Sequence, residues 1–280
     1  MPELPEVETM RRGILGAVGG KIRRLEVPPS RYRPIVMNPT LERMNEQLIG
    51  RRISDILRLG KRVLIVCSRR REGDLFLTLQ PKMAGLVAVD EVPSVEHLRL
   101  IVYLTGSSIR QLSYWDRRGL GTVHLFDREQ LTRLEQTSLG PDALAVDAQE
   151  FALRLRPAKT PIKPALLQQH RIAGVGNLYA SEILHAAGID PARRCCDLDE
   201  ASFVCIHEQM RRILLTAIEY EGSTLSDGTY RNALNRDGSY QNAHRVYDRA
   251  GQACLSCGCD IIRRVVQAQR STFYCPTCQR

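Results

Sequence analysis

Four cysteines near the C-terminus constrain the fold of this 280-residue chain more than any other feature. They form two pairs, Cys254-x2-Cys257 and Cys275-x2-Cys278, separated by seventeen residues. This spacing is typical of four-thiolate zinc sites, because each pair can grip one side of a tetrahedral ion from a tight turn. The residues between the pairs, 261–273, are β-like with a polar tip. We therefore expect a β-hairpin that binds one structural Zn²⁺, since four thiolates leave no open coordination position.

The other five cysteines are expected to be ordinary small apolar side chains. They are Cys67, Cys195, Cys196, Cys205 and Cys259. Cys259 is an alternative zinc ligand, although its use would break the symmetry of the two pairs.

The acidic N-terminus, MPELPEVETM, lacks the pattern of a signal peptide, and no apolar run approaches the ~20 residues of a membrane helix. These features predict a cytoplasmic protein, in which disulfides are not expected.

The charge balance points toward a polyanionic partner. The chain has 40 Lys and Arg against 31 Asp and Glu, which gives a net charge of +9. Each Lys or Arg that contacts a phosphate releases a condensed counterion, so such an excess favours nucleic-acid binding. Charge alone is equally consistent with a basic protein that has no such partner.

Hydrophobic patterning separates a β-rich region from its surroundings. Residues 5–18 carry apolar side chains at helical spacing. From about residue 21 to residue 126, short β-rich stretches recur between turn residues, which predicts an antiparallel sandwich or barrel. The stretches are Ile53–Leu59, Arg62–Cys67, Asp74–Leu79, Leu98–Leu104, Ile109–Tyr114 and Thr122–Phe126.

Helical patterning returns near residue 128 and, after a predicted linker at 138–147, dominates residues 151–221. Thr160–Gln169 and Asn177–Ala187 are expected to be helices joined by a glycine-containing turn, and Asp199–Tyr220 a long third helix. Residues 222–245 are polar and rich in Gly, Asn and Asp, which predicts a long functional loop. We therefore expect three domains, at residues 1–140, 150–245 and 246–280.

The glycine turn has the sequence Arg171-Ile-Ala-Gly-Val-Gly-Asn177. Asn177 is predicted to be the N-cap of the helix that follows. Gly174 and Gly176 permit a close backbone approach, and the free amides of a helix N-terminus suit a DNA phosphate. A structural turn between packed helices is the alternative interpretation.

Pro2 becomes the terminal residue once the initiator Met is removed, which a proline here usually permits. Its secondary amine would be a good imine-forming nucleophile, because a terminal amine (pKa near ~8) is far more neutral than lysine at physiological pH. Glu3 and Glu6 lie beside it in the sequence, and either could supply a proton. A plain turn before a helix is the alternative interpretation.

Three motifs together resemble the formamidopyrimidine-DNA glycosylase family. They are PELPEVE at the N-terminus, GVGNLYASEIL at Gly174–Leu184, and the terminal QRSTFYCPTCQ. Their order and separation match the family, and the resemblance covers essentially the whole chain. It implies an α+β protein with an N-terminal antiparallel β-sandwich flanked by helices, a helix-two-turn-helix domain and a C-terminal zinc β-hairpin finger. The implied function is base-excision repair by a DNA glycosylase that is also an abasic-site lyase.

The resemblance also implies roles for the N-terminal residues. The amine of Pro2 would attack the anomeric carbon of the damaged nucleotide, and Glu3 would act as general acid during opening of the deoxyribose. Glu6 would help to arrange the site, and Lys61 matches a lysine near the lesion and its phosphate. The imine is an electron sink, so β- and δ-elimination would break both flanking phosphodiester bonds. The lesion must leave the base stack for this, at a cost of a few kcal/mol.

Other positions match DNA-contacting residues of the family. Met83 matches the side chain that fills the gap left by the extruded base, and Arg118 the arginine that reads the orphaned cytosine, with Leu120 as an apolar wedge. Contacts to phosphate or near the active centre are expected from Lys163, Asn177 and Arg270. The expected partner is duplex DNA with oxidised bases, bound by a monomer in a bacterial-type, nucleoid-associated setting without membrane or obligatory protein partner. Without the resemblance, Met83 suggests core filling and Arg118 a solvated loop charge.

Several positions depart from the family pattern. Gln80-Pro81 replaces the common His-Leu, Leu120 replaces a phenylalanine, and Gln168 stands where an aspartate is common. The loop at residues 226–244, which in the family helps to select among lesions, departs most. The PELPEVE motif resembles the purine-specific branch, so we expect 8-oxoguanine opposite cytosine and formamidopyrimidines as substrates. The alternatives are a relative that prefers oxidised pyrimidines, a non-catalytic zinc-dependent binder of damaged DNA, and a zinc ribbon that binds protein.

Overall fold

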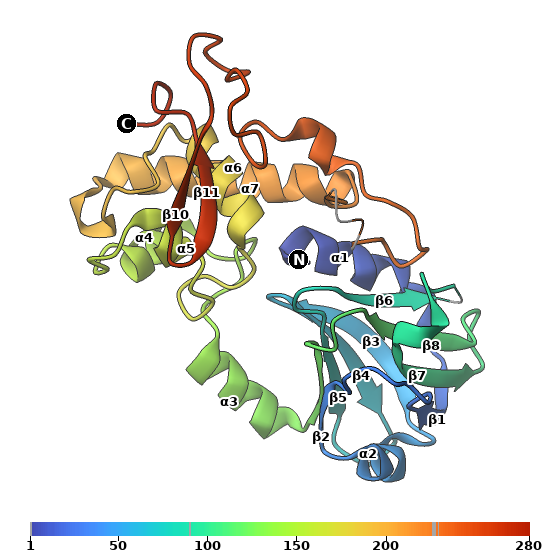
Figure 1. Ribbon diagram of the computed structural model, residues 1–280. Coiled ribbons are helices and arrows are strands. Elements are labelled where there is room, and N and C mark those ends of the chain that lie inside the picture. The colour runs from blue at the N-terminus through green and yellow to red at the C-terminus, as the bar shows by residue number, and fades with distance from the viewer. Residues whose placement is uncertain (1, 90, 226–227, 229) are drawn as a thin grey trace. The chain divides into compact units, whose positions relative to one another are not determined.

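The computed structural model describes residues 2–89, 91–225, 228 and 230–280, and has the α+β architecture that the sequence predicts (Figure 1). It divides into two compact units. The first comprises Met1–Gln136 with Ile218–Gln241, and the second Thr137–Ala217 with Asn242–Arg280. The units therefore do not simply follow the order of the chain, because residues 218–241 return to the N-terminal unit after the long helix.

Nine strands of the first unit form one hydrogen-bonded sheet, in the order β2-β9-β5-β4-β3-β1-β7-β8-β6. Neighbouring strands are antiparallel except β2 and β9 at one edge, which are parallel. A short junction at Lys21 and Arg52 joins β1 to β3 and divides the sheet into two layers. The bounds are β1 Lys21–Glu26, β2 Val36–Asn38, β3 Arg52–Leu59, β4 Arg62–Ser68, β5 Leu75–Gln80, β6 Gly85–Val89, β7 Leu98–Thr105, β8 Gln111–Asp116 and β9 Thr122–Phe126.

Helix α1 (Leu4–Gly13) packs against β3 and β4 from one layer and β6 from the other. Its side chains Val7 and Met10 are fully buried in the core that these strands share. The predicted helix at residues 5–18 is confirmed, but it ends at Gly13 and gives way to the short 3-10 turn Leu15–Ala17. Burial of a helix start of this kind fixes the position of the residues that precede it.

Four strands and helices of the first unit are not among those predicted: β1, β2, β6 and α2 (Leu41–Leu48). Strand β2 has only three residues, too few to show an alternating pattern. In β1 a bulge between Ile22 and Arg24 breaks the alternation of apolar and polar residues that marks a strand. Strand β6 begins at a glycine, which patterning treats as an interruption. Only eight residues form α2, too few to show a helical period clearly.

The second unit is a helical layer with a β-hairpin packed on it. Its helices are α4 Ala148–Leu155, α5 Ile162–Leu166, α6 Asn177–Ala186 and most of α7 Glu200–Glu219, and the hairpin consists of β10 Arg263–Gln267 and β11 Arg270–Tyr274. Helix α6 packs against both α5 and β11. The helix expected at Thr160–Gln169 is shorter than predicted, whereas α6 and α7 agree to within one residue at each end.

Connecting segments complete the chain. Helix α3 (Arg128–Ser138) buries Leu131 against Val66 and Phe76, on the outer face of β4 and β5. In the described part of the polar segment 222–245, the 3-10 turn Tyr240–Ala243 is the one helical or extended element. Positions 226, 227 and 229 of the loop expected to select among lesions lie outside the described residues.

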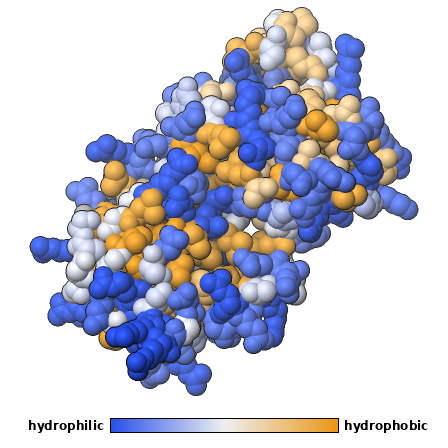
Figure 2. Space-filling model, turned by 180° about the vertical axis from the view of Figure 1, so that it is seen from behind, coloured by the Kyte–Doolittle hydropathy of each residue, from blue (hydrophilic) through white to orange (hydrophobic). Residues whose placement is uncertain are grey.

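Hydrophilic residues cover much of the face that Figure 2 shows. This agrees with a chain in which charged residues make up 25% of the sequence. Among the described residues, no helix has the length and apolar character needed to cross a lipid bilayer.

Candidate active site, nucleic-acid interface and zinc centre

The N-terminal motif is anchored by a buried carboxylate. Glu3 and Glu6 are each 3% exposed, and Pro2 is also buried. The amide of Glu3 donates to Glu6 Oε2 at 2.8 Å, and the amide of Ser223 donates to Glu6 Oε1 at 3.0 Å. Glu6 therefore performs the helix-capping function of a carboxylate at the third helical position, and also ties the 222–241 segment to the start of α1.

Gly222 permits this close approach. Its φ is +81°, and a Cβ at this position would lie 2.8 Å from Glu6 Oε1. A larger residue would strain the backbone and displace the carboxylate at the same time. The backbone conformation at Gly222 is therefore part of the arrangement around Glu3.

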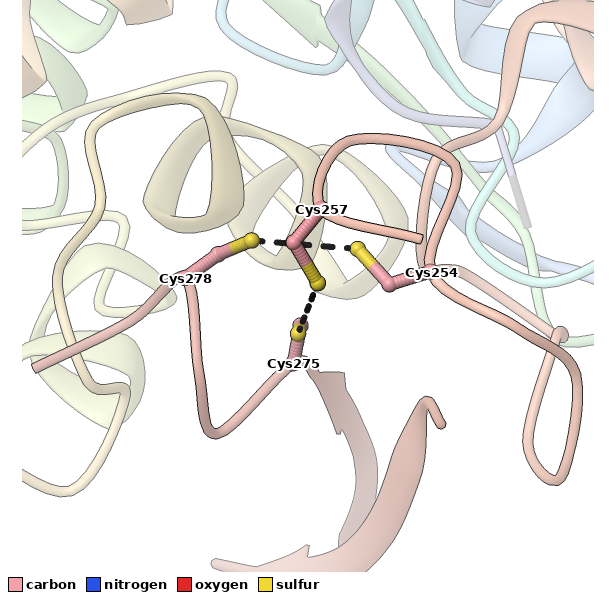
Figure 3. Close-up of side chains that lie close together, drawn as sticks. All are labelled: Cys254, Cys257, Cys275 and Cys278. Atoms are coloured by element: carbon pink, nitrogen blue, oxygen red, sulfur yellow. Dashed lines mark hydrogen bonds between the residues drawn. The ribbon is translucent and has the colours of Figure 1, made fainter. Parts of the chain in front are cut away.

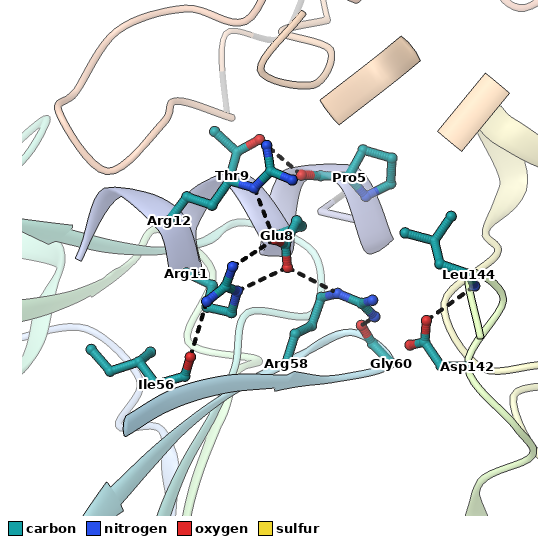
Figure 4. A network of polar contacts seen from close by, with 10 residues as sticks. All are labelled: Pro5, Glu8, Thr9, Arg11, Arg12, Ile56, Arg58, Gly60, Asp142 and Leu144. Atoms are coloured by element: carbon teal, nitrogen blue, oxygen red, sulfur yellow. Dashed lines mark hydrogen bonds and ion pairs between the residues drawn. The ribbon is translucent and has the colours of Figure 1, made fainter. Parts of the chain in front are cut away.

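A second buried carboxylate, Glu8, supports the turn that carries Lys61 (Figure 4). Glu8 accepts hydrogen bonds from Arg11 at 2.8 and 3.0 Å, from Arg12 at 2.9 Å and from Arg58 at 3.3 Å. Arg58 also donates to the carbonyl of Gly60 at 3.1 Å, next to the half-buried Lys61. Burial alone would raise the pKa of the Glu8 carboxyl, but the arginine hydrogen bonds outweigh it and lower this pKa. Lys61 is thus presented from a turn fixed to α1.

The expected gap-filling and base-reading residues occupy two loops of the same unit. Met83 lies in the turn between β5 and β6 and is 39% exposed. Arg118 is exposed and Leu120 half-buried in the loop between β8 and β9. The carboxylate of Asp116 closes that loop, because it accepts the amides of Arg118 at 3.0 Å and Gly121 at 2.7 Å. Asp116 is a site residue that sequence patterning missed, since an aspartate at a strand end carries no distinctive signal.

Lys163 and Asn177 meet the hairpin in the second unit. Lys163 is 1% exposed, and its Nζ donates to Asn177 Oδ1 at 2.7 Å, Ser271 O at 3.0 Å and Thr272 Oγ1 at 2.8 Å. Asn177 Nδ2 donates to the same Ser271 carbonyl at 3.0 Å. A buried ammonium with three acceptors is stabilised where it lies. The predicted site residues thus form two groups, one in each unit.

The prediction that Asn177 is an N-cap is wrong. The N-cap of α6 is Gly176, which makes no side-chain capping hydrogen bond, and Asn177 is the first helical residue. Its side-chain oxygen is engaged by Lys163 and its nitrogen by Ser271, so neither returns to the helix backbone. Tertiary hydrogen bonds have outcompeted the local capping interaction.

Arg270 stands at the tip of the hairpin, where it is exposed. The strands pair Gln267 with Arg270, so a two-residue turn of Ala268 and Gln269 connects them. Both turn residues have positive φ, 45° and 60°, as the type I′ turn of a tight hairpin requires. This geometry projects Arg270 from a rigid support.

The four predicted zinc ligands come together at the base of this hairpin, where Cys275 directly follows β11 (Figure 3). Their sulfurs lie within 4.8 Å of one another, and the pairs Cys254–Cys278 and Cys257–Cys275 are 3.8 and 3.7 Å apart. A tetrahedral ion with Zn–S bonds of about 2.3 Å requires sulfurs about 3.8 Å apart. Cys259, the alternative ligand, is exposed and is not a member of the cluster. The donor set therefore fits one structural Zn²⁺.

Two buried polar residues connect this cluster to α6. His185 Nε2 lies 3.7 Å from Cys254 Sγ. Glu182 is 2% exposed and accepts the amides of Arg245, Val246 and Tyr247 at 2.8 to 3.0 Å. The chain entering the zinc module is thereby held to the helix that presents Asn177. Both residues were missed, because on a helix with so many buried positions they look like ordinary core-facing side chains.

Family comparisons account for almost the whole chain. The formamidopyrimidine-DNA glycosylase N-terminal domain matches residues 1–123, the H2TH domain of that enzyme residues 139–229, and the zinc finger found in FPG and IleRS residues 251–280. Together with the fold, these matches define a DNA glycosylase of base-excision repair that carries a structural zinc finger.

Full-length relatives make the assignment specific. The formamidopyrimidine-DNA glycosylase of Chloroflexus aurantiacus is 37% identical over 100% of this chain and 98% of its own length. That of Symbiobacterium thermophilum is 38% identical over 100% of this chain and 89% of its own. The chain belongs to the formamidopyrimidine-DNA glycosylase family. The predicted fold class, the predicted enzyme class of glycosylase and abasic-site lyase, and the predicted zinc cofactor are confirmed.

Solved structures of the Lactococcus lactis Fpg protein agree. A complex of a variant with Fapy-dG-containing DNA has a TM-score of 0.85 and 33% identity, and covers 100% of both chains. A complex of the wild-type protein with DNA that contains an oxidised pyrimidine has a TM-score of 0.84 at the same identity and coverage. These neighbours are DNA complexes of both lesion classes, so the fold by itself does not select a lesion.

Proposed function

We propose that this chain removes oxidised purines, 8-oxoguanine opposite cytosine and formamidopyrimidines, from duplex DNA through an imine at Pro2. The observation that carries the proposal is the grip of Glu6 on two backbone amides, one of them beside Pro2 and the other at the start of the 222–241 segment. This grip supports a preorganised N-terminus rather than a frayed one. In this proposal residues 1–140, 150–245 and 246–280 act as the catalytic, helix-two-turn-helix and zinc-finger domains of a monomer.

The proposed chemistry uses the N-terminal residues in turn. The Pro2 nitrogen attacks C1′ of the lesion, and the base leaves with the electron pair of the glycosidic bond and takes up the proton that the Pro2 nitrogen loses. Glu3 donates a proton to O4′ as the C1′–O4′ bond breaks, which leaves an iminium ion between Pro2 and the sugar. Loss of the C2′ proton then expels the 3′-phosphate, and loss of the C4′ proton expels the 5′-phosphate. Water finally hydrolyses the imine and restores the Pro2 amine.

The remaining site residues bind and position DNA in this proposal. Lys61 lies near the lesion phosphate, Met83 and Leu120 fill and wedge the vacated stack, and Arg118 reads the opposite cytosine. Asn177 and Arg270 contact phosphates. The contacts of the buried Lys163 support a role in holding these two rather than direct contact with DNA. Zn²⁺ held by Cys254, Cys257, Cys275 and Cys278 would keep the hairpin folded and takes no part in the chemical steps.

A preference for oxidised pyrimidines is the second candidate. It is favoured by Leu120, which lacks the aromatic face of the usual wedge, and by the oxidised-pyrimidine complex of the Lactococcus relative. Nicking of duplexes that differ only in the lesion separates the two candidates. Faster cleavage at 8-oxoguanine supports the purine assignment, whereas cleavage of oxidised pyrimidines with 8-oxoguanine left intact reverses it.

Borohydride trapping tests the chemistry itself. The wild-type protein should form a covalent adduct with lesion DNA after reduction of the imine. Pro2→Gly should reduce trapping by at least ~10-fold, because the imine of a primary amine can lose its proton and become a weaker electron sink. Pro5→Ala is the matched control in the same motif and should trap normally. Equal trapping by wild type and Pro2→Gly would contradict a requirement for the secondary amine of Pro2.

A further inference from the structure

Arg99 is an unusual buried arginine at the start of β7. It is 3% exposed, although arginine is rarely buried unless it has a specific partner. Its Nε donates to the carbonyl of Asp116 at 2.9 Å, and its Nη1 donates to Ser30 Oγ at 2.9 Å. Nη2 is buried with no hydrogen-bond partner among the described residues, and the ring of Tyr32 lies 5.9 Å from Cζ. Such a group costs free energy, so its contacts need an explanation beyond packing.

One contact of Arg99 leads to the base of the loop that carries Arg118. Asp116, the acceptor of Nε, is fully buried, and its carboxylate binds the amides of Arg118 and Gly121. Arg99 thus fixes the backbone of the residue whose side chain closes the loop. Any shift of Asp116 would move both ends of the loop together.

The other contact leads to the tip of the same loop. Ser30 lies three residues before Arg33, whose carbonyl oxygen contacts Gly119 so closely that a Cβ there would be 2.5 Å away. Gly119 has a φ of +63°, so the tip is tight both in conformation and in packing. Arg99 therefore anchors the loop and also the segment on which the loop rests.

Ile35 and Met37 of this segment pack against the core, but the part around Ser30 is exposed. A pocket of about 390 Å³ lies beside it, lined by residues that include Pro28, Pro34, Met37 and Leu98 as well as Arg99. Where a segment borders open space, discrete hydrogen bonds rather than close packing fix its position. The hydrogen bond from Arg99 Nη1 to Ser30 Oγ supplies part of that restraint, together with the bond from Ser30 Oγ to the carbonyl of Glu96 at 3.1 Å.

We propose that Arg99 is a positioning residue that determines how strictly the enzyme discriminates the base opposite the lesion. This inference rests on the proposed function, in which Arg118 reads that base. Hydrogen-bonded readout of a base edge depends on fixed geometry, and the exposed Arg118 obtains its geometry from the loop. Loosening of the loop should therefore impair reading of the opposite base more than it impairs the chemistry at Pro2.

The test compares Arg99→Met with the wild type and with Arg24→Met. Arg24 is a matched control, because it also lies in this sheet and over a tyrosine ring but is exposed. Single-turnover excision of the lesion that the wild type cuts fastest is measured opposite each of the four bases. Arg99→Met should lower the preference for cytosine by about 10-fold, the order of one good base contact. Arg24→Met should retain the preference.

A second substrate separates reading from chemistry. In a duplex with an abasic site opposite another abasic site there is no base to read, so Arg99→Met should trap with borohydride within about 2-fold of wild type. Gly119→Ala perturbs the same loop with Arg99 intact and should also lower the preference, which keeps the test valid if Arg99→Met does not fold. An equal loss opposite all four bases, or an unchanged preference in both variants, overturns the inference. A wild type that neither excises nor traps any lesion overturns the proposed function instead.

Discussion

At the residue scale, buried carboxylates do most of the positioning in the first unit. Glu6 holds the N-terminal backbone, Asp116 closes the loop of Arg118, and Glu8 gathers three arginines behind the turn of Lys61. A buried carboxylate is stable only where hydrogen bonds or positive charges replace its hydration. Each therefore fixes the groups that satisfy it.

Glu8→Gln should lower the free energy of unfolding by about 1–3 kcal/mol, because it leaves partly buried arginines without their counter-charge. Because the pKa of Glu8 is lowered on folding, its contribution to the free energy of unfolding is fully present at pH values above the ordinary pKa of 4.5. This contribution is lost as the pH falls through the lower pKa of the folded state. Urea denaturation of variant and wild type should therefore converge in acid. The exposed pair Glu129–Arg133 gives the control, since Glu129→Gln should change stability by less than about 0.5 kcal/mol. A pH-independent difference for Glu8→Gln would contradict this explanation.

At the element scale, the zinc hairpin is held by the metal site on one side and α6 on the other. The core of the module is small: Val246, Cys254, Ile262, Phe273 and Cys275 are its buried residues. A core of this size cannot stabilise a fold without a cross-link. Order at Arg270 therefore depends on the metal as well as on the contacts of the hairpin with α6.

Removal of zinc by a chelator should weaken DNA binding without unfolding the first unit, whose core is separate. Cys275→Ser should likewise abolish the one bound zinc and raise the Kd for lesion DNA by at least ~10-fold. Cys259→Ser is the matched control, an exposed cysteine of the same module outside the cluster. Metal analysis and fluorescence anisotropy are the measurements. Loss of zinc from Cys259→Ser, or its retention in Cys275→Ser, would show that the ligand set is wrong.

At the scale of the whole molecule, the net charge of +9 affects how the protein associates with charged partners and does not determine its fold. Contacts with phosphate release counterions. A plot of the logarithm of the DNA association constant against the logarithm of the salt concentration should therefore be a straight line with a negative slope. Arg270→Ala should lower the magnitude of that slope by about 1, as expected for loss of one phosphate contact. Arg133→Ala, which removes an exposed arginine paired with Glu129, should leave the slope unchanged. An unchanged slope in Arg270→Ala would exclude that residue from the phosphate contacts.

Much of the architecture could be predicted, because it depends on local patterns. The cysteine spacing identified the four cysteines that come together, and the apolar periodicities located α1, α6, α7 and most strands. The failures have local causes too: a bulge hides β1, and an initial glycine hides β6. Asn177 shows the opposite case, in which a sound local rule lost to partners distant in the sequence.

The sequence by itself determined the family, the four clustered cysteines and the order of most elements, since spacing and periodicity are properties of neighbouring residues. Only the tertiary structure showed that Lys163 is buried between Asn177 and the hairpin, and that Arg99 joins the two supports of the Arg118 loop. These contacts bring together residues 69 and 108 positions apart. The burial and hydrogen-bond geometry that decide such pairings arise only when separate elements pack against one another.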